Sequence, residues 1–187
     1  RKLTNMKMNE KGQMVAPATI KMTANDFKNN NGTSVYWLSG GGAMINSHGT
    51  IIMIDPVLEG FDMPLLIDMP ILPREIPKVD VVLVSHSDSD HYSRVTCKGV
   101  KSVCREYHTT LYVASLMQEE CGINGIGHDI SDHFQVDDVD IELTPADHAW
   151  QNLDERYSYR VWEYGECCGF YLRTSDATIW YVGDSKL

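Results

Sequence analysis

The stretch that decides the fold is Val81-Val82-Leu83-Val84-Ser85-His86-Ser87-Asp88-Ser89-Asp90-His91-Tyr92. Its unbroken apolar run, residues 81–84, predicts a strand that is buried on both faces. Four side chains that can bind a metal ion follow within six residues, and they are His86, Asp88, Asp90 and His91. In layered α/β folds, ligands bind at the ends of such strands, so we expect the functional site here.

In an extended loop, residues 86, 88 and 90 project to one side, while His91 turns to another, because side chains alternate along extended backbone. This spacing predicts two neighbouring clusters of ligands. Imidazole and carboxylate groups suit zinc, manganese or iron. The alternative is a polar turn whose Asp and Ser residues cap the next helix. We expect one of them to act as a cap, but capping requires no histidine.

The composition indicates a globular domain that does not bind nucleic acid. A chain of 187 residues with 43% hydrophobic residues can bury a core of its own. The formal net charge of −10 argues against a grip on a phosphate backbone, which needs clustered Lys and Arg. We therefore expect a small-molecule substrate.

Cysteine usage and hydropathy predict a cytoplasmic protein. The five cysteines are an odd number and include the adjacent pair Cys167-Cys168, which resembles neither a disulfide framework nor a zinc knuckle. No stretch approaches the roughly 20 apolar residues of a membrane span, and the N-terminal segment has no apolar region typical of secretion signals.

The pattern along the chain predicts a leader followed by one domain. Residues 1–33 are polar and weakly periodic, so we interpret them as a leader segment and assign residues 34–187 to the domain. Alternating apolar residues predict three antiparallel strands at 35–38, 43–45 and 50–54. A proline-rich connection, residues 56–77, is expected to lie over the rim of the site.

Beyond the 81–84 strand, the pattern predicts helical structure through 93–106, a strand at 109–113, and a helix at 114–121 closed by Gly122. Further strands are expected at 139–144, 169–173 and 178–182, the last two joined by a hairpin turn.

Two more strand ends carry candidate ligands. His148 follows Leu143-Thr144-Pro145-Ala146-Asp147, and Asp184 follows Trp180-Tyr181-Val182-Gly183. Each is ambiguous alone, but the cluster at 86–91 favours both as ligands. Asp55 closes an earlier strand, where a supporting role and a simple turn are equally compatible with the pattern. The remaining histidines, which have no comparable neighbours in sequence, are His48, His108, His128 and His133.

The successive motifs resemble those of the metallo-β-lactamase superfamily. The motifs are Ile54-Asp55-Pro56, residues 85–91, Thr144-Pro145-Ala146-Asp147-His148 and Val182-Gly183-Asp184-Ser185. The last two are most similar to the branch with ascorbate-6-phosphate lactonase and N-acyl-phosphatidylethanolamine phospholipase D. The resemblance covers roughly residues 34–187 and implies an α/β fold, a four-layer αβ/βα sandwich with two divalent metal ions.

By that resemblance, each candidate ligand acquires a role. His86 and His148 would hold the first ion, Asp90 and His91 the second, Asp184 would bridge the two, and Asp55 would support the site from beneath. The ions would be zinc or manganese, with iron as a further candidate. Asp90 would also orient the attacking water and pass a proton to the leaving group.

Two departures from the family pattern bear on these expectations. Asp88 stands where the family usually has a second His, which makes the first site harder and favours manganese, magnesium or iron relative to zinc. Family members also continue past Asp184 to one last ligand His. We therefore expect the domain to be incomplete at its C-terminus, with one apolar sheet face left bare to associate with the missing segment or with another copy.

The leading hypothesis is a metal-dependent hydrolase that uses a metal-activated water on a small ester-like bond, a lactone or a phosphodiester. The alternatives are a metal-binding module of the same fold without hydrolytic activity, and a structural domain whose clustered acids form a solvated turn.

Overall fold

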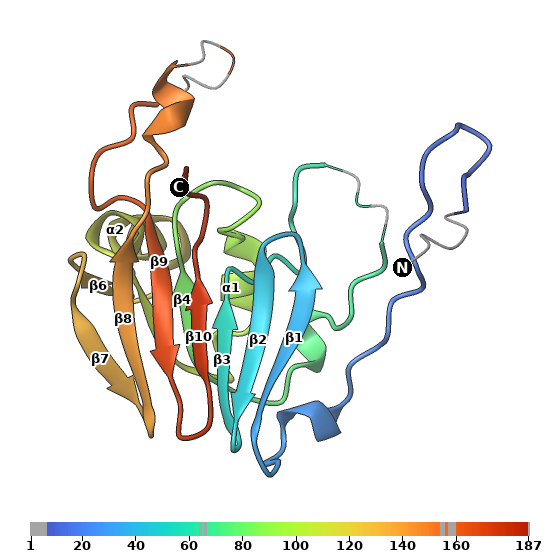
Figure 1. Ribbon diagram of the computed structural model, residues 1–187, viewed down its shortest axis with the longest axis horizontal. Helices are drawn as coiled ribbons and strands as arrows, with labels where there is room; N and C mark the ends of the chain where they lie inside the picture. Colours follow the sequence, from blue (N-terminus) through green and yellow to red (C-terminus); the bar gives the residue numbers. More distant parts are fainter. Residues whose placement is uncertain (1–6, 64, 66, 154–155, 157–159, 187) are drawn as a thin grey trace.

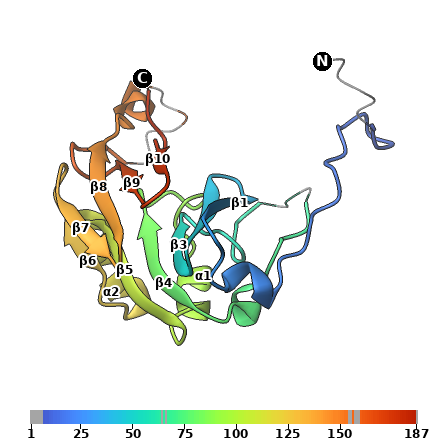
Figure 2. The same cartoon turned by 60° about the horizontal axis from the view of Figure 1, so that its bottom comes forward.

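Two β-sheets face each other, and two helices cover the outer side of one of them (Figures 1 and 2). A computed structural model of the chain describes residues 7–63, 65, 67–153, 156 and 160–186. In these residues the layers run helix, sheet, sheet. The structure thus confirms the predicted α/β class, and the described residues hold three of the four expected layers.

The larger sheet has six strands in the order β1-β2-β3-β4-β5-β6. The first three strands are antiparallel, as predicted, and β3 to β6 run parallel. The strands are β1 (Thr33–Ser39), β2 (Gly42–Ser47), β3 (Thr50–Ile54), β4 (Val79–Val84), β5 (Cys104–Thr110) and β6 (Ile126–His128). Helices α1 (Arg94–Gly99) and α2 (Leu111–Cys121) lie on its outer face.

The smaller sheet is antiparallel, with the order β10-β9-β8-β7. Its strands are β7 (His133–Val136), β8 (Val139–Pro145), β9 (Cys168–Arg173) and β10 (Thr178–Tyr181). Short 3-10 helices lie at Ala24–Phe27, Pro73–Glu75 and Ala149–Leu153. The longest described α-helix, α2, has 11 residues, and no described helix is long and apolar enough to cross a bilayer.

Strand β4 is buried on both faces, as the sequence predicts. Val82 and Val84 pack toward the helices, while Val81 and Leu83 pack toward the smaller sheet. All four side chains are fully buried. The strand therefore ends at the rim between two apolar layers, and the polar loop that follows it is placed there.

The outer face of the smaller sheet differs from the expectation of a bare apolar face. Its outward side chains form ion pairs, in which Arg173 contacts Asp140 at 2.8 Å and Glu142 at 3.1 Å. Tyr171 lies under the same guanidinium at 4.5 Å. The expectation was wrong because β8 and β9 alternate apolar residues inward with Asp140, Glu142 and Arg173 outward, so these two strands present charged groups on the outer face.

The boundary between β5 and α2 also differs from the prediction. The segment predicted as helical through 106 is already strand from Cys104, and the segment predicted as a strand at 109–113 is helical from Leu111. Thr110 decides the boundary, because its hydroxyl accepts a hydrogen bond from Val113 N at 3.3 Å and caps the helix. The predicted end of this helix at Gly122 is confirmed, with Gly122 at φ 61°.

Part of the proposed leader packs on the domain. Phe27 is 4% exposed and belongs to the core between the larger sheet and the helices. The Asn46 amide donates to Asp26 O and Lys28 O, both at 2.8 Å, and so ties this segment to β2. The proline-rich connection reaches the loop after β4, where Ser89 donates to Asp62 at 3.4 Å.

A pair of histidines closes the seam between the edges of the two sheets. His108 on β5 and His128 on β6 share a hydrogen bond of 2.8 Å between their rings, and Phe134 on β7 stacks on both. Burial lowers the pKa of both histidines, and this effect outweighs the attraction of Glu106 for His108 and of Asp132 for His128. The folded chain therefore holds both rings neutral.

This seam predicts a loss of stability in mild acid. A histidine whose pKa is lowered by folding stabilises the folded state above its unfolded pKa of about 6.5, and this stability is lost as the pH falls toward the folded pKa. We expect the unfolding free energy to fall more steeply from pH 7.5 to 5.5 in the native chain than in a His128→Gln variant. Urea unfolding at several pH values measures this. A His133→Gln variant, changed at an exposed histidine, is the control, and identical slopes for the native chain and His128→Gln would contradict the interpretation.

Candidate metal centre

The carboxylate of Asp55 anchors the site. It lies at the end of β3, is fully buried, and adopts a left-handed backbone with φ 45°. It accepts hydrogen bonds from Ser85 N at 2.7 Å, Ser85 Oγ at 2.5 Å, Tyr181 OH at 2.7 Å and His91 Nδ1 at 2.7 Å. Burial alone would raise the pKa of Asp55, but hydrogen bonding and charge from His91, with the charge of His86, lower it below its ordinary value.

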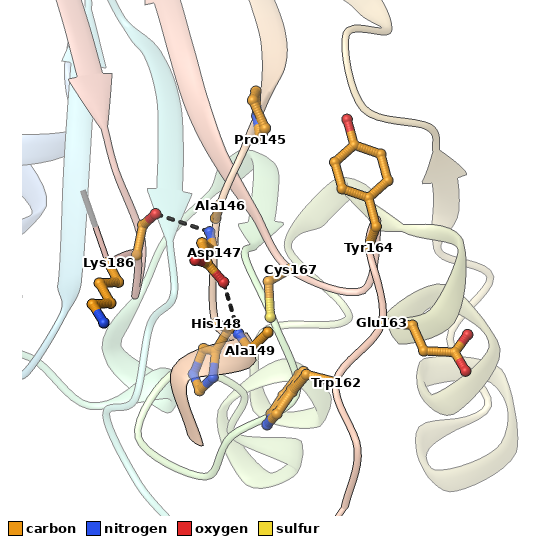
Figure 3. A pocket seen from close by; sticks show the side chains of 11 residues that line it. Pro145, Ala146, Asp147, His148, Ala149, Trp162, Glu163, Tyr164, Cys167 and Lys186 are labelled. Carbon is orange, nitrogen blue, oxygen red and sulfur yellow. Dashed lines mark hydrogen bonds between the residues drawn. The ribbon is translucent and has the colours of Figure 1, made fainter. Parts of the chain in front are cut away.

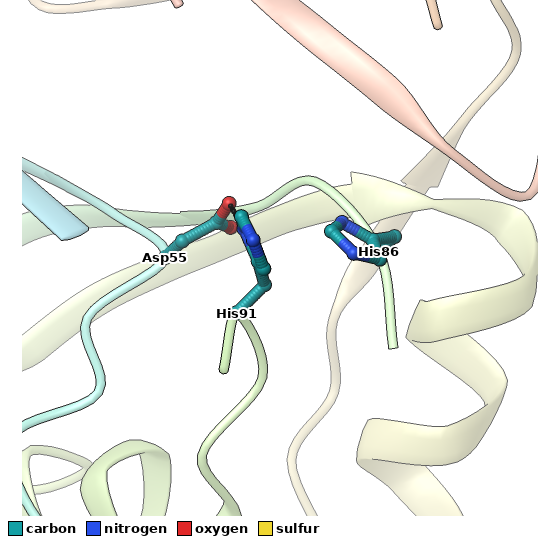
Figure 4. Close-up of side chains that lie close together, drawn as sticks. All are labelled: Asp55, His86 and His91. Atoms are coloured by element: carbon teal, nitrogen blue, oxygen red, sulfur yellow. Dashed lines mark hydrogen bonds and ion pairs between the residues drawn. The ribbon is translucent and has the colours of Figure 1, made fainter. Parts of the chain in front are cut away.

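The loop after β4 carries both histidines of the motif (Figure 4). His86 follows Ser85 directly, and a turn in which His91 N and Tyr92 N both donate to Asp88 O brings His91 beside it. The two imidazole centroids are 4.2 Å apart. Ser93 caps α1 by accepting from Thr96 N at 3.0 Å, so the cap lies outside the candidate ligands.

The first group of candidate ligands is His86, Asp88 and His148. One atom from each lies within 4.8 Å of the others. Asp88 Oδ2 is 3.6 Å from His86 Nε2 and 3.3 Å from His148 Nε2. Both imidazoles are almost completely buried, and within the described residues His86 Nε2 makes no hydrogen bond. A buried nitrogen without such a partner is costly, so this donor set fits a cation.

The second group is Asp90, His91 and Asp184, again with ligand atoms within 4.8 Å of one another. His91 Nε2 is 3.2 Å from Asp184 Oδ1 and 3.8 Å from Asp90 Oδ2. Burial would lower the pKa of His91, but hydrogen bonds and charge from Asp184 and Asp55 raise it to about 10. A cation at Nε2 would displace that proton.

Asp184 lies between the two groups. Its Oδ1 contacts His91, and its Oδ2 is 3.9 Å from His148 Nε2. The hydrogen bond to His91, with the positive charges of the three histidines, lowers its pKa despite partial burial. Its carboxylate thus lies within reach of both candidate ligand groups. Gly41 lets the β1–β2 turn approach closely, because a Cβ there would meet His91 Cε1 at 2.8 Å.

The structure brings all six predicted ligands together. Groups from the loop after β4, from the end of β8 and from the end of β10 converge, although they are separated by up to about half the chain. Their role as metal ligands stays a prediction. A third combination of close groups joins Asp55 to His86 and His91, but the four donors on its carboxylate favour the predicted supporting role.

Trp162, which packs on the first group, was not predicted from the sequence. Its ring centroid is 4.4 Å from that of His148 and 5.6 Å from that of His86. Its Nε1 donates to Gln151 Oε1 at 3.3 Å, and the Gln151 amide donates to Asp88 Oδ2 at 3.5 Å. Trp162 therefore packs on two candidate ligands and reaches the third, Asp88, through Gln151.

Arg160 also packs on Trp162. Its guanidinium lies 4.1 Å from the Trp162 ring and 4.3 Å from the Tyr112 ring. It also donates to Ser87 Oγ at 3.3 Å, inside the motif, and pairs with Glu166. Gln151, Arg160, Trp162 and Glu166 all lie in the chain between β8 and β9. The aperiodic sequence of this connection carries no signal that would have identified them.

Comparison with known proteins shows the family to which this chain belongs. Residues 50–187 match the family model described as the beta-lactamase superfamily domain. A UPF0173 metal-dependent hydrolase of Pyrococcus furiosus is 30% identical over 138 residues, which cover 72% of this chain and 54% of that protein. Another, of Caldivirga maquilingensis, is 25% identical over 155 residues, which cover 81% of this chain and 59% of that protein. The chain thus spans little more than half the length of these relatives.

The fold itself is shared with a solved structure. An isothiocyanate hydrolase from Delia radicum gut bacteria is 22% identical and superimposes with a TM-score of 0.62, covering 82% of this chain and 63% of that chain. At this identity the similarity shows the fold alone, and it confirms the predicted metallo-β-lactamase architecture.

The ring contact between Trp162 and His148 predicts that Trp162 supports metal binding. Trp162→Leu would remove the aromatic ring that packs on the His148 imidazole, so we expect manganese affinity at the first group to fall about 10- to 100-fold, the range for lost supporting contacts. Trp162→Phe, which keeps an aromatic face, should retain most of the affinity. Calorimetric titration with MnCl2 measures this.

The matched control for this prediction is Trp180→Leu, on the outer face of the smaller sheet, which should leave the affinity unchanged. Thermal unfolding of each variant separates lost metal binding from lost folding. An unchanged affinity in folded Trp162→Leu would contradict the supporting role.

Proposed function

We propose that this chain, which belongs to the family of the beta-lactamase superfamily domain, is the metal-binding part of a hydrolase. The hydrolase would act on a small ester-like bond. The observation that carries the proposal is the pair of adjacent ligand groups joined by Asp184. Curated relatives bear the name metal-dependent hydrolase, and this supports the reaction class. A lactone and a phosphodiester are the two substrate classes proposed.

The donor sets indicate which cations the site would take. The first group offers two nitrogens and one oxygen, and the second offers one nitrogen and two oxygens. Asp88 in place of a third imidazole makes the first group harder, which favours manganese or iron relative to zinc. Two divalent cations held there would lower the pKa of a water molecule and polarise the carbonyl or phosphoryl oxygen of a substrate.

The protein side chains divide the remaining tasks. Asp55 fixes the His91 ring by accepting from Nδ1, so that Nε2 faces Asp184 and Asp90. The Asp90 side chain is 55% exposed, in contrast to the buried imidazoles, and is therefore open to substrate. We assign it the proton transfer: it accepts a proton from the attacking water and delivers it to the leaving oxygen.

The test is turnover of a lactone panel and of bis(p-nitrophenyl) phosphate by the chain supplied with manganese, zinc or iron. We expect turnover that is lost on chelation with EDTA and that falls about 10²- to 10⁴-fold in Asp90→Asn, the usual contribution of a general acid or base. Asp138→Asn, changed at an exposed aspartate, is the control.

Two outcomes would overturn the proposal. Turnover in Asp90→Asn and after EDTA treatment that equals the turnover of the untreated native chain would contradict the assigned chemistry. Tight metal binding without turnover of any substrate would instead favour a metal-binding module that has no hydrolytic activity.

A further inference from the structure

A pocket of about 360 Å³ lies directly beside His148 (Figure 3). Three segments contribute to it: residues 145–149 at and after the end of β8, residues 162–167 before β9, and residues 185–186 after β10. Its volume falls within the range of small-molecule pockets, which begins at about 300 Å³. If the scissile bond of a substrate lay at the candidate metal centre, a neighbouring substituent of that substrate could occupy this pocket.

The walls of the pocket are mostly apolar. They include two aromatic rings, a proline ring, two methyl groups and a thiol, which belong to Trp162, Tyr164, Pro145, Ala146, Ala149 and Cys167. Burial raises the pKa of the Cys167 thiol well above its ordinary value, so it stays uncharged and acts as part of the apolar wall.

The charged groups of the pocket do not form an anion site. The Asp147 carboxylate accepts a hydrogen bond from Ala149 N at 3.1 Å, within its own turn. Lys186 and Glu163 carry opposite charges and lie on opposite sides of the pocket (Figure 3). A substrate group that carries a negative charge would therefore gain little here, whereas an uncharged apolar group would lose water-exposed surface.

The inner wall is fixed before a ligand arrives. The His148 ring packs at a tilt on Trp162 with 4.4 Å between centroids, and the Arg160 guanidinium lies 4.1 Å from the same Trp162 ring. The indole N–H is also engaged by Gln151. Because these side chains are already held in place, binding a ligand costs little of their conformational entropy. Such a preformed wall favours ligands whose shape fits it.

We propose that this pocket binds an uncharged apolar or aromatic substituent of the substrate next to the scissile bond. The inference rests on the proposed function and narrows its substrates to those that carry such a group. With a lactone or carboxylic ester, the water oxygen bonds to the acyl carbon and the acyl C–O bond breaks. One water proton passes to the leaving oxygen, and the products are a carboxylic acid and a hydroxyl group.

The experiment compares γ-phenyl-γ-butyrolactone with γ-butyrolactone, which share the bond but differ in the apolar group. For the manganese-loaded chain we expect kcat/KM to be at least about tenfold higher for the phenyl lactone, as burial of a ring allows. Ala149→Phe, which fills the pocket, should lower this ratio at least about tenfold, and Tyr164→Ala should also lower it. Val161→Ala, changed at an exposed apolar residue in the same segment, should leave the ratio unchanged.

Binding of 3-phenylcyclopentanone, which cannot be hydrolysed, separates the two claims. Binding to the native chain that Ala149→Phe abolishes, without turnover of either lactone or of bis(p-nitrophenyl) phosphate, would support the pocket and contradict the proposed function. Equal kcat/KM for both lactones, unchanged by Ala149→Phe, would overturn the pocket inference and leave the hydrolase proposal standing.

Discussion

The buried carboxylate of Asp55 is the interaction on which the arrangement of the site depends. A single ionised group at the end of β3 accepts hydrogen bonds from the end of β4, from the following loop and from Tyr181 on β10. Because a fully buried charge is stable only when its hydrogen-bonding capacity is met, these segments are held to one relative position. Tyr181 belongs to the smaller sheet, so the same carboxylate ties the two sheets together where the ligand groups meet.

This anchor explains how side chains from distant strands form one site. The apolar layers on both faces of β4 fix where the strand ends, and the loop that follows places His86 and His91 on either side of a single turn. The ends of β8 and β10 then bring in His148 and Asp184 from the second sheet. A site divided between two sheets in this way can form only when the two sheets are packed together. Metal binding by the candidate ligands therefore depends on correct folding of the whole sandwich.

Much of this arrangement could be predicted from the sequence because its signals are local. The Val81–Val84 run indicated a doubly buried strand, and the crowded loop after it indicated the ligands. The strand propensity of the segment after His108 was misleading, because a side-chain cap at Thr110 starts a helix there. Trp162, Arg160 and Gln151 could not be predicted, since their contacts are long-range and arise in a connection without periodicity. The polar outer face of the smaller sheet was likewise missed, although residues 140, 142 and 173 carry its charges in plain alternation.

The most direct measurement is the anomalous scattering of crystals grown with manganese. The account requires two anomalous peaks a few ångströms apart, one among His86, Asp88 and His148 and the other among Asp90, His91 and Asp184, with Asp184 in contact with both. Crystals that hold manganese at another place on the chain, or that show these six side chains unoccupied at saturating manganese, would contradict it.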